Sequence, residues 1–381
     1  TTNNGISLIP TFSLGKPALL FTLSLGKNKL SFEPDFNFSL EGKPWSMLFW
    51  FRYNMVQRDN FSLRLGIIPN FNYIFSEKFD IENKLLMPEE FLPEIQCPSV
   101  MKLDKKSKIK LANESVRWQM SSILHGEQGA LNLSASLCHI LKDQGAQEYA
   151  ANQTREEARH VTGFAKYIKS RWGKPLPVGQ TLGDLLTELV NAPEVYKKIV
   201  GMQILVEGLA MGAFATIYQH SHDPILVKLM QLVMTDEAFH HKFGKIWADK
   251  TIPKLDEKEQ NIIEDWAANC FQILLFNLVN PEQKKIIYEQ FGLDWKEVLN
   301  ELHEIISDDT RREAMSDSTN IFRVLVKTLL KAGIITDRTK DFYSVYVNLD
   351  ELNAEGDRIC LLYTSDAADE GLGVDLGGRR I

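Results

Sequence analysis

The sequence predicts an all-α fold that is preceded by a short antiparallel β-hairpin segment. Up to about residue 75, apolar and polar residues alternate as they do in strands, and from about Asp104 the apolar residues recur with the period of a helix. We therefore expect four parts. They are a β-hairpin segment over 1–78, a helical domain over 79–335, a C-terminal extension over 336–359, and an artefactual or disordered tail over 360–381.

The composition is that of an ordinary soluble globular protein, with 44% hydrophobic and 24% charged residues. Because the net charge is −7, there is no general basic surface and we expect no nucleic-acid partner. The cysteines Cys97, Cys138, Cys270 and Cys360 have no disulfide-framework spacing, which fits a reducing, cytoplasmic location. No apolar run is expected to be long enough for a transmembrane helix. A membrane partner is expected only if 1–78 is a natural part of the protein.

The segment 1–78 has the pattern of antiparallel hairpins. In LSFEPDFNFSL (30–40), apolar side chains and Pro34 take the even positions, and in WSMLFWFRY (45–53) the aromatic residues and Met47 share one face. A small soluble β-domain is one interpretation. The segment also resembles the strands of a bacterial outer-membrane β-barrel protein, although five strands cannot close such a barrel. This resemblance implies a fragment, joined either by natural fusion or by faulty assembly, and the tail 360–381 resembles a translated sequencing adapter.

Turn residues divide the rest of the chain into helices. Pro193 is expected in the first turn of its helix, where a missing N–H group costs no hydrogen bond. The segment SHDP (221–224) is expected to end that helix. The predicted helices cover about 104–143, 147–172, 181–191, 193–218, 224–250, 256–279, 281–290, 294–306 and 316–332.

Two of these helices carry the same short motif. Glu157 stands three residues before His160, and Glu237 stands three residues before His240, in a chain with only eight histidines. The i, i+3 spacing places the Glu and the His of each pair on one face of the helix. The Glu and the His of each pair can therefore bind the same partner.

Each motif follows a further glutamate at the same interval, Glu127 in the first case (157 − 127 = 30) and Glu207 in the second (237 − 207 = 30). The midpoints of the two gaps, residues 142 and 222, fall on the turn signals KDQG and HSHDP. Two antiparallel helices that turn at these points would place each lone glutamate level with its motif, since both arms rise equally per residue. The segment around Glu207 is apolar almost all round, which indicates a buried helix.

Together these residues bring four carboxylates and two imidazoles into a helical core. Without compensation such a cluster would be strongly destabilising. Bound cations supply the compensation, and this ligand set suits iron or manganese. The alternative is a set of salt-bridged core residues without a metal.

The segments LHGEQGALNLSASL, EEARHVTGFAKYI, ILVEGLAMGAF and TDEAFHHKFG resemble the ferritin-like carboxylate-bridged diiron proteins, in the bacterial branch related to p-aminobenzoate N-oxygenase. The resemblance covers roughly 85–335 and implies a ferritin-like four-helix bundle with extra C-terminal helices. It also implies that Glu157 and Glu237 bridge two metal ions. The implied metal and catalytic residues are Glu127, Glu157 and His160 for one iron, and Glu207, Glu237 and His240 for the other.

The resemblance extends to the neighbours of these residues, with one departure. Glu156 and Asp236 are implied to accept a hydrogen bond from the histidine of the opposite motif, with surface charge as the alternative. Val233 stands where p-aminobenzoate N-oxygenase has a further His ligand, so arylamine N-oxygenation is not carried over. His241 is expected to point about 100° away from His240, as a surface residue or a residue behind the ligands.

By this resemblance, we expect an oxygenase or oxidase that activates O₂ for the oxidation of a small organic substrate. Its cofactors would be two Fe ions or an Mn/Fe pair, its partners would include an electron donor, and a homodimer is left open. The alternatives are a ferritin-like ferroxidase without an organic substrate, an iron-holding sensor without turnover, or a function of the segment 1–78. A radical-generating ribonucleotide reductase subunit is excluded because Phe164 replaces its tyrosine.

Small and aromatic residues near the motifs suggest two further features. Helix-interior glycines cost about 1 kcal/mol each relative to alanine, so we expect them to make room either for close helix packing or for a substrate channel. These glycines are Gly126, Gly129, Gly208 and Gly212. The candidate apolar wall residues, for which core packing is the alternative, are Phe164, Met211, Phe214 and Phe239.

Overall fold

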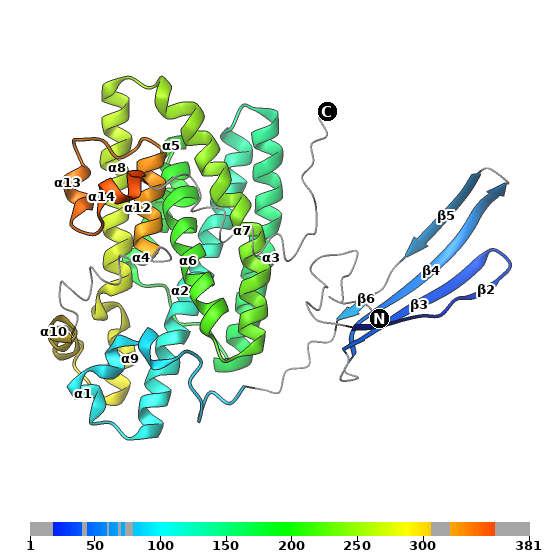
Figure 1. Cartoon of the computed structure of the whole chain (residues 1–381), viewed down its shortest axis with the longest axis horizontal. Helices are drawn as coiled ribbons and strands as arrows, with labels where there is room; N and C mark the ends of the chain where they lie inside the picture. The colour runs from blue at the N-terminus through cyan, green and yellow to red at the C-terminus, as the bar shows by residue number, and fades with distance from the viewer. Residues whose placement is uncertain are drawn as a thin grey trace. The chain divides into compact units, whose positions relative to one another are not determined.

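The computed structural model describes residues 18–39, 44–58, 61–67, 70–72, 79–305 and 321–354. The chain divides into two compact units between Lys78 and Phe79, and each is described by itself (Figure 1). The expected tail over 360–381 lies outside the described residues.

The N-terminal unit is an antiparallel sheet in which β1, β3, β4 and β5 are neighbours in that order. Two short strands complete its described part, since β2 pairs with β3 and β6 pairs with β4. The strands are β1 (Ala18–Thr22), β2 (Leu25–Lys27), β3 (Leu30–Ser39), β4 (Pro44–Arg58), β5 (Phe61–Ile67) and β6 (Asn70–Asn72).

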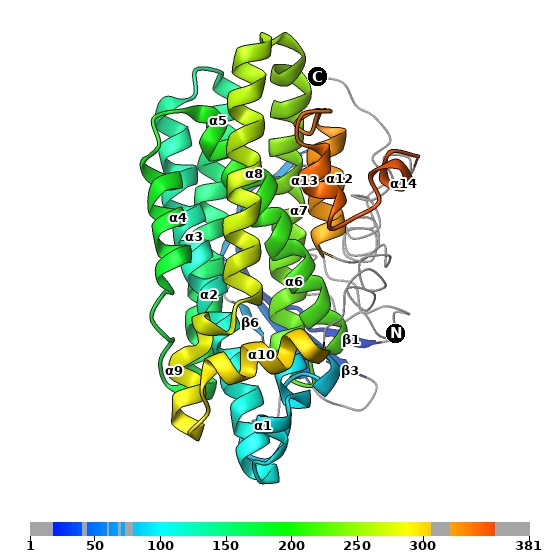
Figure 2. The same cartoon turned by 90° about the vertical axis from the view of Figure 1, so that its left-hand side faces the viewer.

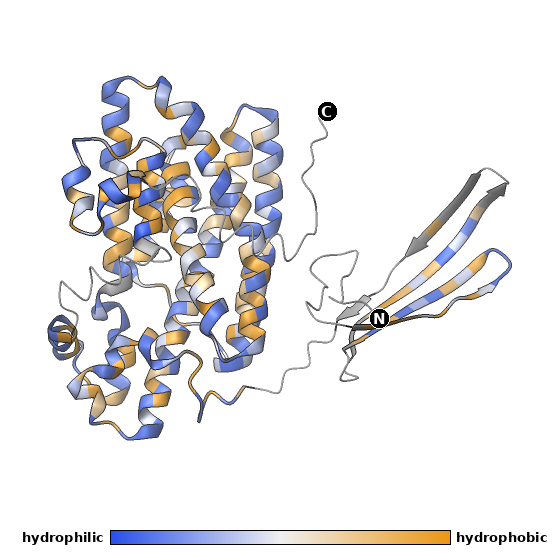
Figure 3. Cartoon of the chain, viewed as in Figure 1, coloured by the Kyte–Doolittle hydropathy of each residue, from blue (hydrophilic) through white to orange (hydrophobic). Residues whose placement is uncertain are grey.

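The register of β3 against β4 explains the alternation of the sequence. Phe32 lies opposite Phe51, and their ring centroids are 4.7 Å apart. On the other face of the same strands, Arg52 forms an ion pair with Glu33. Such cross-strand pairs stabilise a sheet, and Figure 3 shows the alternation of hydrophobic and hydrophilic residues along both strands. The predicted antiparallel strands are confirmed.

Four long helical segments form the centre of the second unit. Helices α2 (Lys105–Ile140) and α3 (Gln144–Trp172) make one antiparallel pair, and α6 (Glu207–His220) and α7 (Pro224–Thr251) make the other. Asp143 caps α3 and Asp223 caps α7, because each side chain accepts a hydrogen bond from a backbone N–H group of the first turn. Both turns fall at the midpoints predicted from the glutamate spacing.

The helical segment that contains α6 differs in two ways from the expectation. It consists of α5 (Val195–Lys198), a π-helical stretch η4 (Ile199–Val206) and α6, and the sequence pattern predicts no π-helical turn. Pro193 lies before the N-cap residue Glu194 rather than in the first turn. In α7, by contrast, Pro224 does take the first position.

This segment also corrects the expectation that no apolar run could span a membrane. Val195–His220 is long and apolar enough by length and composition, since an 18-residue window within it has a mean hydropathy of 1.6. In the structure, 61% of this window is buried inside the protein. A helix that is packed on most sides is apolar almost all round, so its composition matches that of a membrane span.

Further helices surround the central four. Figure 2 shows α8 (Glu257–Val279) running alongside them, and α8 packs on η4 and α4 (Gln180–Asn191). The predicted single helix over 281–290 is instead a series of short turns, which ends at Gly292 with a left-handed φ of 70°. The outer helices are η2 (Glu89–Phe91), η3 (Pro93–Gln96), α1 (Pro98–Met101), α4 (Gln180–Asn191), η5 (Ile252–Lys254), α8 (Glu257–Val279), η6 (Pro281–Lys284), α9 (Lys285–Tyr288), η7 (Glu289–Phe291), α10 (Trp295–Ile305), α12 (Ile321–Lys331), α13 (Lys340–Ser344) and α14 (Leu349–Ala354).

The predicted ligands stand, along the chain, between the two largest apolar clusters of the helical unit. On α2, Leu124 belongs to one cluster and Ala130 to the other, with Glu127 between them. Leu205 and Phe214 flank Glu207 in the same way. Carboxylates at such positions are shielded from water on both sides.

Candidate metal centre

The structure brings all six predicted side chains together from four helices, α2, α3, α6 and α7. Every one of them is buried, and the most exposed, Glu127, retains 6% of its surface. Their ligand atoms form two groups, within each of which all atoms lie within 4.8 Å of one another. The first group contains Glu127, Glu157, His160 and Glu237, and the second contains Glu157, Glu207, Glu237 and His240.

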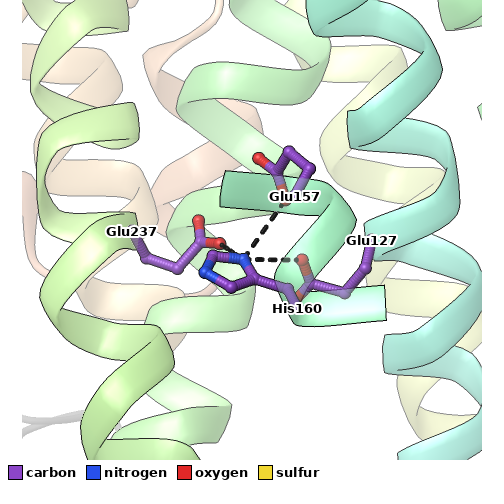
Figure 4. Close-up of side chains that lie close together, drawn as sticks. All are labelled: Glu127, Glu157, His160 and Glu237. Atoms are coloured by element: carbon purple, nitrogen blue, oxygen red, sulfur yellow. Dashed lines mark hydrogen bonds and ion pairs between the residues drawn. The ribbon is translucent and has the colours of Figure 1, made fainter. Parts of the chain in front are cut away.

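The first group is arranged around one imidazole nitrogen (Figure 4). His160 Nδ1 lies 3.2 Å from Glu127 Oε2, 3.3 Å from Glu157 Oε2 and 3.0 Å from Glu237 Oε1. Three carboxylates from three helices therefore converge on a single point.

The second group repeats this arrangement around His240. Its Nδ1 atom lies 3.1 Å from Glu157 Oε1 and 3.3 Å from Glu237 Oε2. Glu157 and Glu237 thus turn one oxygen toward each histidine, and the two imidazole centroids are 6.0 Å apart. The two glutamates that belong to both groups are the pair that the resemblance implies as bridging.

The remaining nitrogen of each imidazole faces an acid on the opposite helix. His160 Nε2 lies 3.1 Å from Asp236 Oδ2, and His240 Nε2 lies 3.0 Å from Glu156 Oε2. These are the two hydrogen bonds implied by the resemblance. With Nε2–H donating to a carboxylate, Nδ1 is left as the nitrogen that can bind a cation.

Burial dominates the electrostatics of this cluster. Burial, followed by repulsion from Glu237, raises the pKa of both Glu127 and Glu207 well above the ordinary value. Burial also acts to raise the pKa of Glu157, but hydrogen bonds from both imidazoles outweigh it and lower that pKa. Within the described residues, the cationic partners of these carboxylates are the histidines alone, with no lysine or arginine.

The donor atoms fit divalent cations. Glu207 Oε2 is buried and accepts no hydrogen bond, which is costly unless another partner is present. When ionised, the four glutamates carry a charge of −4, which two divalent cations would balance. Carboxylate oxygen and imidazole nitrogen suit first-row transition metals.

Two buried glutamines complete the cluster, and the sequence reasoning missed both. Gln153 donates from Nε2 to Glu157 Oε1 at 3.0 Å and to Glu207 Oε1 at 2.9 Å, and its Oε1 accepts from Gln203 Nε2 at 3.0 Å. A signal was present, since Gln203 is a polar residue in the apolar run IVGMQILV and stands four residues before Glu207.

Two expectations for neighbouring aromatic residues change. Phe239 is 52% exposed, so it is not a wall of the site and that interpretation is wrong. Phe164 and Phe214 are fully buried and stack with centroids 5.8 Å apart, whereas Met211 is half-buried. Of the two alternatives expected for His241, the surface position is wrong, because His241 is buried and its Nδ1 donates to the carbonyl of Gln203.

Two of the four flanking glycines allow close packing. A Cβ atom at Gly129 would lie 2.8 Å from Leu186 Cδ2, and one at Gly208 would lie 2.8 Å from Leu325 Cδ2. Gly126 differs, since a Cβ atom there would meet no other atom within 4 Å. Helix packing therefore explains Gly129 and Gly208 but not Gly126.

No protein-family model and no curated protein matches this chain in sequence. The geometry of the buried cluster is therefore the main guide to function.

Proposed function

We propose that the helical domain is a ferritin-like diiron protein, which binds two iron ions and activates O₂ to oxidise or oxygenate a small organic substrate. The observation that carries this proposal is the pair of overlapping ligand groups that share Glu157 and Glu237. One glutamate from each of two helices and a Glu-x-x-His motif from each of two others is the ligand pattern of carboxylate-bridged dimetal sites.

Each residue of the cluster has a role in this proposal. When bound, ferrous iron would supply the electrons that reduce O₂. Glu157 and Glu237 would hold both ions, and Asp236 and Glu156 fix the orientation of the imidazoles. The stacked apolar rings beside the site exclude water, which limits side reactions.

Iron loading of the full-length protein tests the proposal directly. Loaded with Fe(II) without oxygen, the wild type should bind two iron ions per chain, and admission of air should cause O₂ uptake with the near-ultraviolet absorption of ferric ions. The Glu207→Gln variant should lose at least one ion and this absorption, because an amide oxygen is a poorer ligand than a carboxylate. Glu148→Gln, an exposed position on the same helix as Glu157, is the matched control and should behave as the wild type.

The outcome also separates the proposed oxygenase or oxidase from a ferroxidase. With Fe(II) in large excess and no organic substrate, an oxygenase should consume O₂ only for its bound pair, whereas a ferroxidase should continue until the Fe(II) is oxidised. Wild-type protein that binds no iron or manganese, or a Glu207→Gln variant with unchanged loading, would contradict the dimetal proposal.

A further inference from the structure

The buried amides of Gln153 and Gln203 form a chain that ends on the metal ligands. Both N–H groups of the Gln153 amide point at carboxylates, one on Glu157 and one on Glu207. Because carboxylates only accept hydrogen bonds, the orientation of this amide is fixed, and its oxygen faces Gln203. Gln153 retains 1% of its surface and Gln203 retains none.

The other half of the site, around Glu127 and His160, has no counterpart of these two glutamines. Gln153 stands four residues before Glu157, and the residue four before Glu237 is Val233. Gln203 stands four residues before Glu207, and the residue four before Glu127 is Ile123. Val233 is buried and Ile123 half-buried in one apolar cluster. The two halves thus have the same types of ligand but differ in the residues behind the ligands.

This difference decides which lone glutamate keeps its position when a cation binds. Glu127 has one hydrogen bond among the described residues, with His160 Nδ1, and that nitrogen is itself a ligand atom. Glu207 is held through Oε1 by Gln153, which is not a ligand, and its Oε2 is unpartnered. Glu207 therefore has a free oxygen for a cation while its position stays fixed, whereas Glu127 must exchange its only hydrogen bond.

We propose that Gln153 is a positioning residue that pre-forms the cation position of Glu207 and His240, so that this position binds divalent metal more tightly than that of Glu127 and His160. The inference rests on the proposed dimetal function. The π-helical stretch supports it, because Gln203 lies within η4 and Glu207 follows its last residue. Such stretches occur frequently at functional sites.

Stepwise titration of the full-length apoprotein with Co(II), followed by visible spectroscopy and calorimetry, tests the inference. The wild type should bind two ions with clearly different affinities. Gln153→Met, which keeps the length of the side chain but removes its hydrogen bonds, should weaken the tighter step about 10- to 100-fold, as loss of a group that orients a ligand does. Val233→Ala, at the equivalent position of the other half, should leave the tighter step within about threefold of the wild type.

Each outcome bears on one proposal. Wild-type protein that binds no Co(II) would contradict the proposed dimetal function itself. Two equal wild-type steps, or an unchanged tighter step in Gln153→Met, would overturn the role of Gln153 and leave the dimetal function standing. If circular dichroism shows that Gln153→Met does not fold, Gln203→Met decides, because it removes only the hydrogen bond that supports Gln153. It should also weaken the tighter step, and an unchanged step would again overturn the inference.

Discussion

Each imidazole of the cluster is held at both of its nitrogens. Nδ1 faces the shared carboxylates, and Nε2 faces an acid from the opposite helix. A free imidazole ring could rotate about its side-chain bonds and present either nitrogen. The acids Asp236 and Glu156 therefore select both the orientation and the tautomer that a metal ligand needs.

We expect Glu156→Ala to weaken divalent cation binding about 10- to 100-fold, because His240 loses the acceptor that orients it. Cobalt(II) titration of the full-length protein measures this, and circular dichroism checks that the helices are retained. Glu148→Ala, which removes an exposed acid from the same helix, serves as the control. Equal affinities in both variants would show that the contact with His240 does not matter for binding.

The six residues at the centre of the cluster could be predicted from spacing, and the acids Glu156 and Asp236 from the resemblance, but the other side chains around them could not. Phe239 and His241 flank His240, yet the phenylalanine is exposed and the histidine is buried. The reason lies on another helix, since Gly208 leaves the space that His241 occupies. A pattern within α7 contains no information about a glycine on α6.

At the scale of elements, helix ends were predictable where a capping residue or a turn marks them, as at Asp143 and Asp223. The π-helical stretch η4 was not predictable. In IVGMQILV nearly every residue is apolar, so the hydrophobic period has no phase from which a wider turn could be recognised. The helix itself was predicted over 193–218, close to its observed ends, but its apolar composition was not recognised as that of a possible membrane span.

One ion pair, in which the carboxylate is buried and the lysine partly exposed, links two short elements and should make stability depend on pH. Glu94 of η3 accepts hydrogen bonds from Lys284 of η6 at 2.7 Å and from Ser115 at 2.8 Å. Burial acts to raise the pKa of Glu94, but Lys284 and Ser115 outweigh it and hold the pKa below the ordinary value of 4.5. The folded state therefore favours the ionised form, so its contribution is complete above about pH 4.5 and is lost as the pH falls through the lowered pKa.

We expect Glu94→Gln to lower the free energy of unfolding by about 3 kcal/mol at neutral pH, because it leaves Lys284 without its buried partner. The loss should shrink as the pH falls below 4.5. Urea unfolding across pH 3 to 7 measures both effects. Glu289→Gln breaks the exposed pair with Lys285, and its cost should stay below about 1 kcal/mol at every pH. A loss that does not vary with pH would contradict this assignment.

At the scale of the whole molecule, the change from strand to helix periodicity predicted the division of the chain, because the two patterns bury different faces. The division between Lys78 and Phe79 coincides with the first expected boundary, whereas the helical unit continues without a division across the expected boundary between 335 and 336. The association of the four central helices followed from the equal spacing of the glutamates. The series of short turns after α8 could not be predicted from this spacing, since Pro281 and the left-handed Gly292 affect only the turns in which they lie.

We expect residues 79–359, produced without the β-sheet unit, to be a soluble helical protein that binds cations in the same two steps as the full-length chain. All six ligands and both glutamines lie within this range. Sedimentation, circular dichroism and Co(II) titration test this. An insoluble product, with the full-length chain soluble, would show that the helical unit depends on the segment 1–78.

The reciprocal hydrogen bonds between α3 and α7 have a consequence for recognising related proteins. Each helix carries, in five consecutive positions, a ligand pair and the acid that orients the histidine of its partner: Glu156 to His160, and Asp236 to His240. Two copies of this five-residue motif can pair, because the acid of each copy faces the histidine of the other. Two copies of the motif (an acid, then Glu-x-x-His), each following a lone glutamate at the same interval, could identify distant relatives whose remaining sequence has diverged.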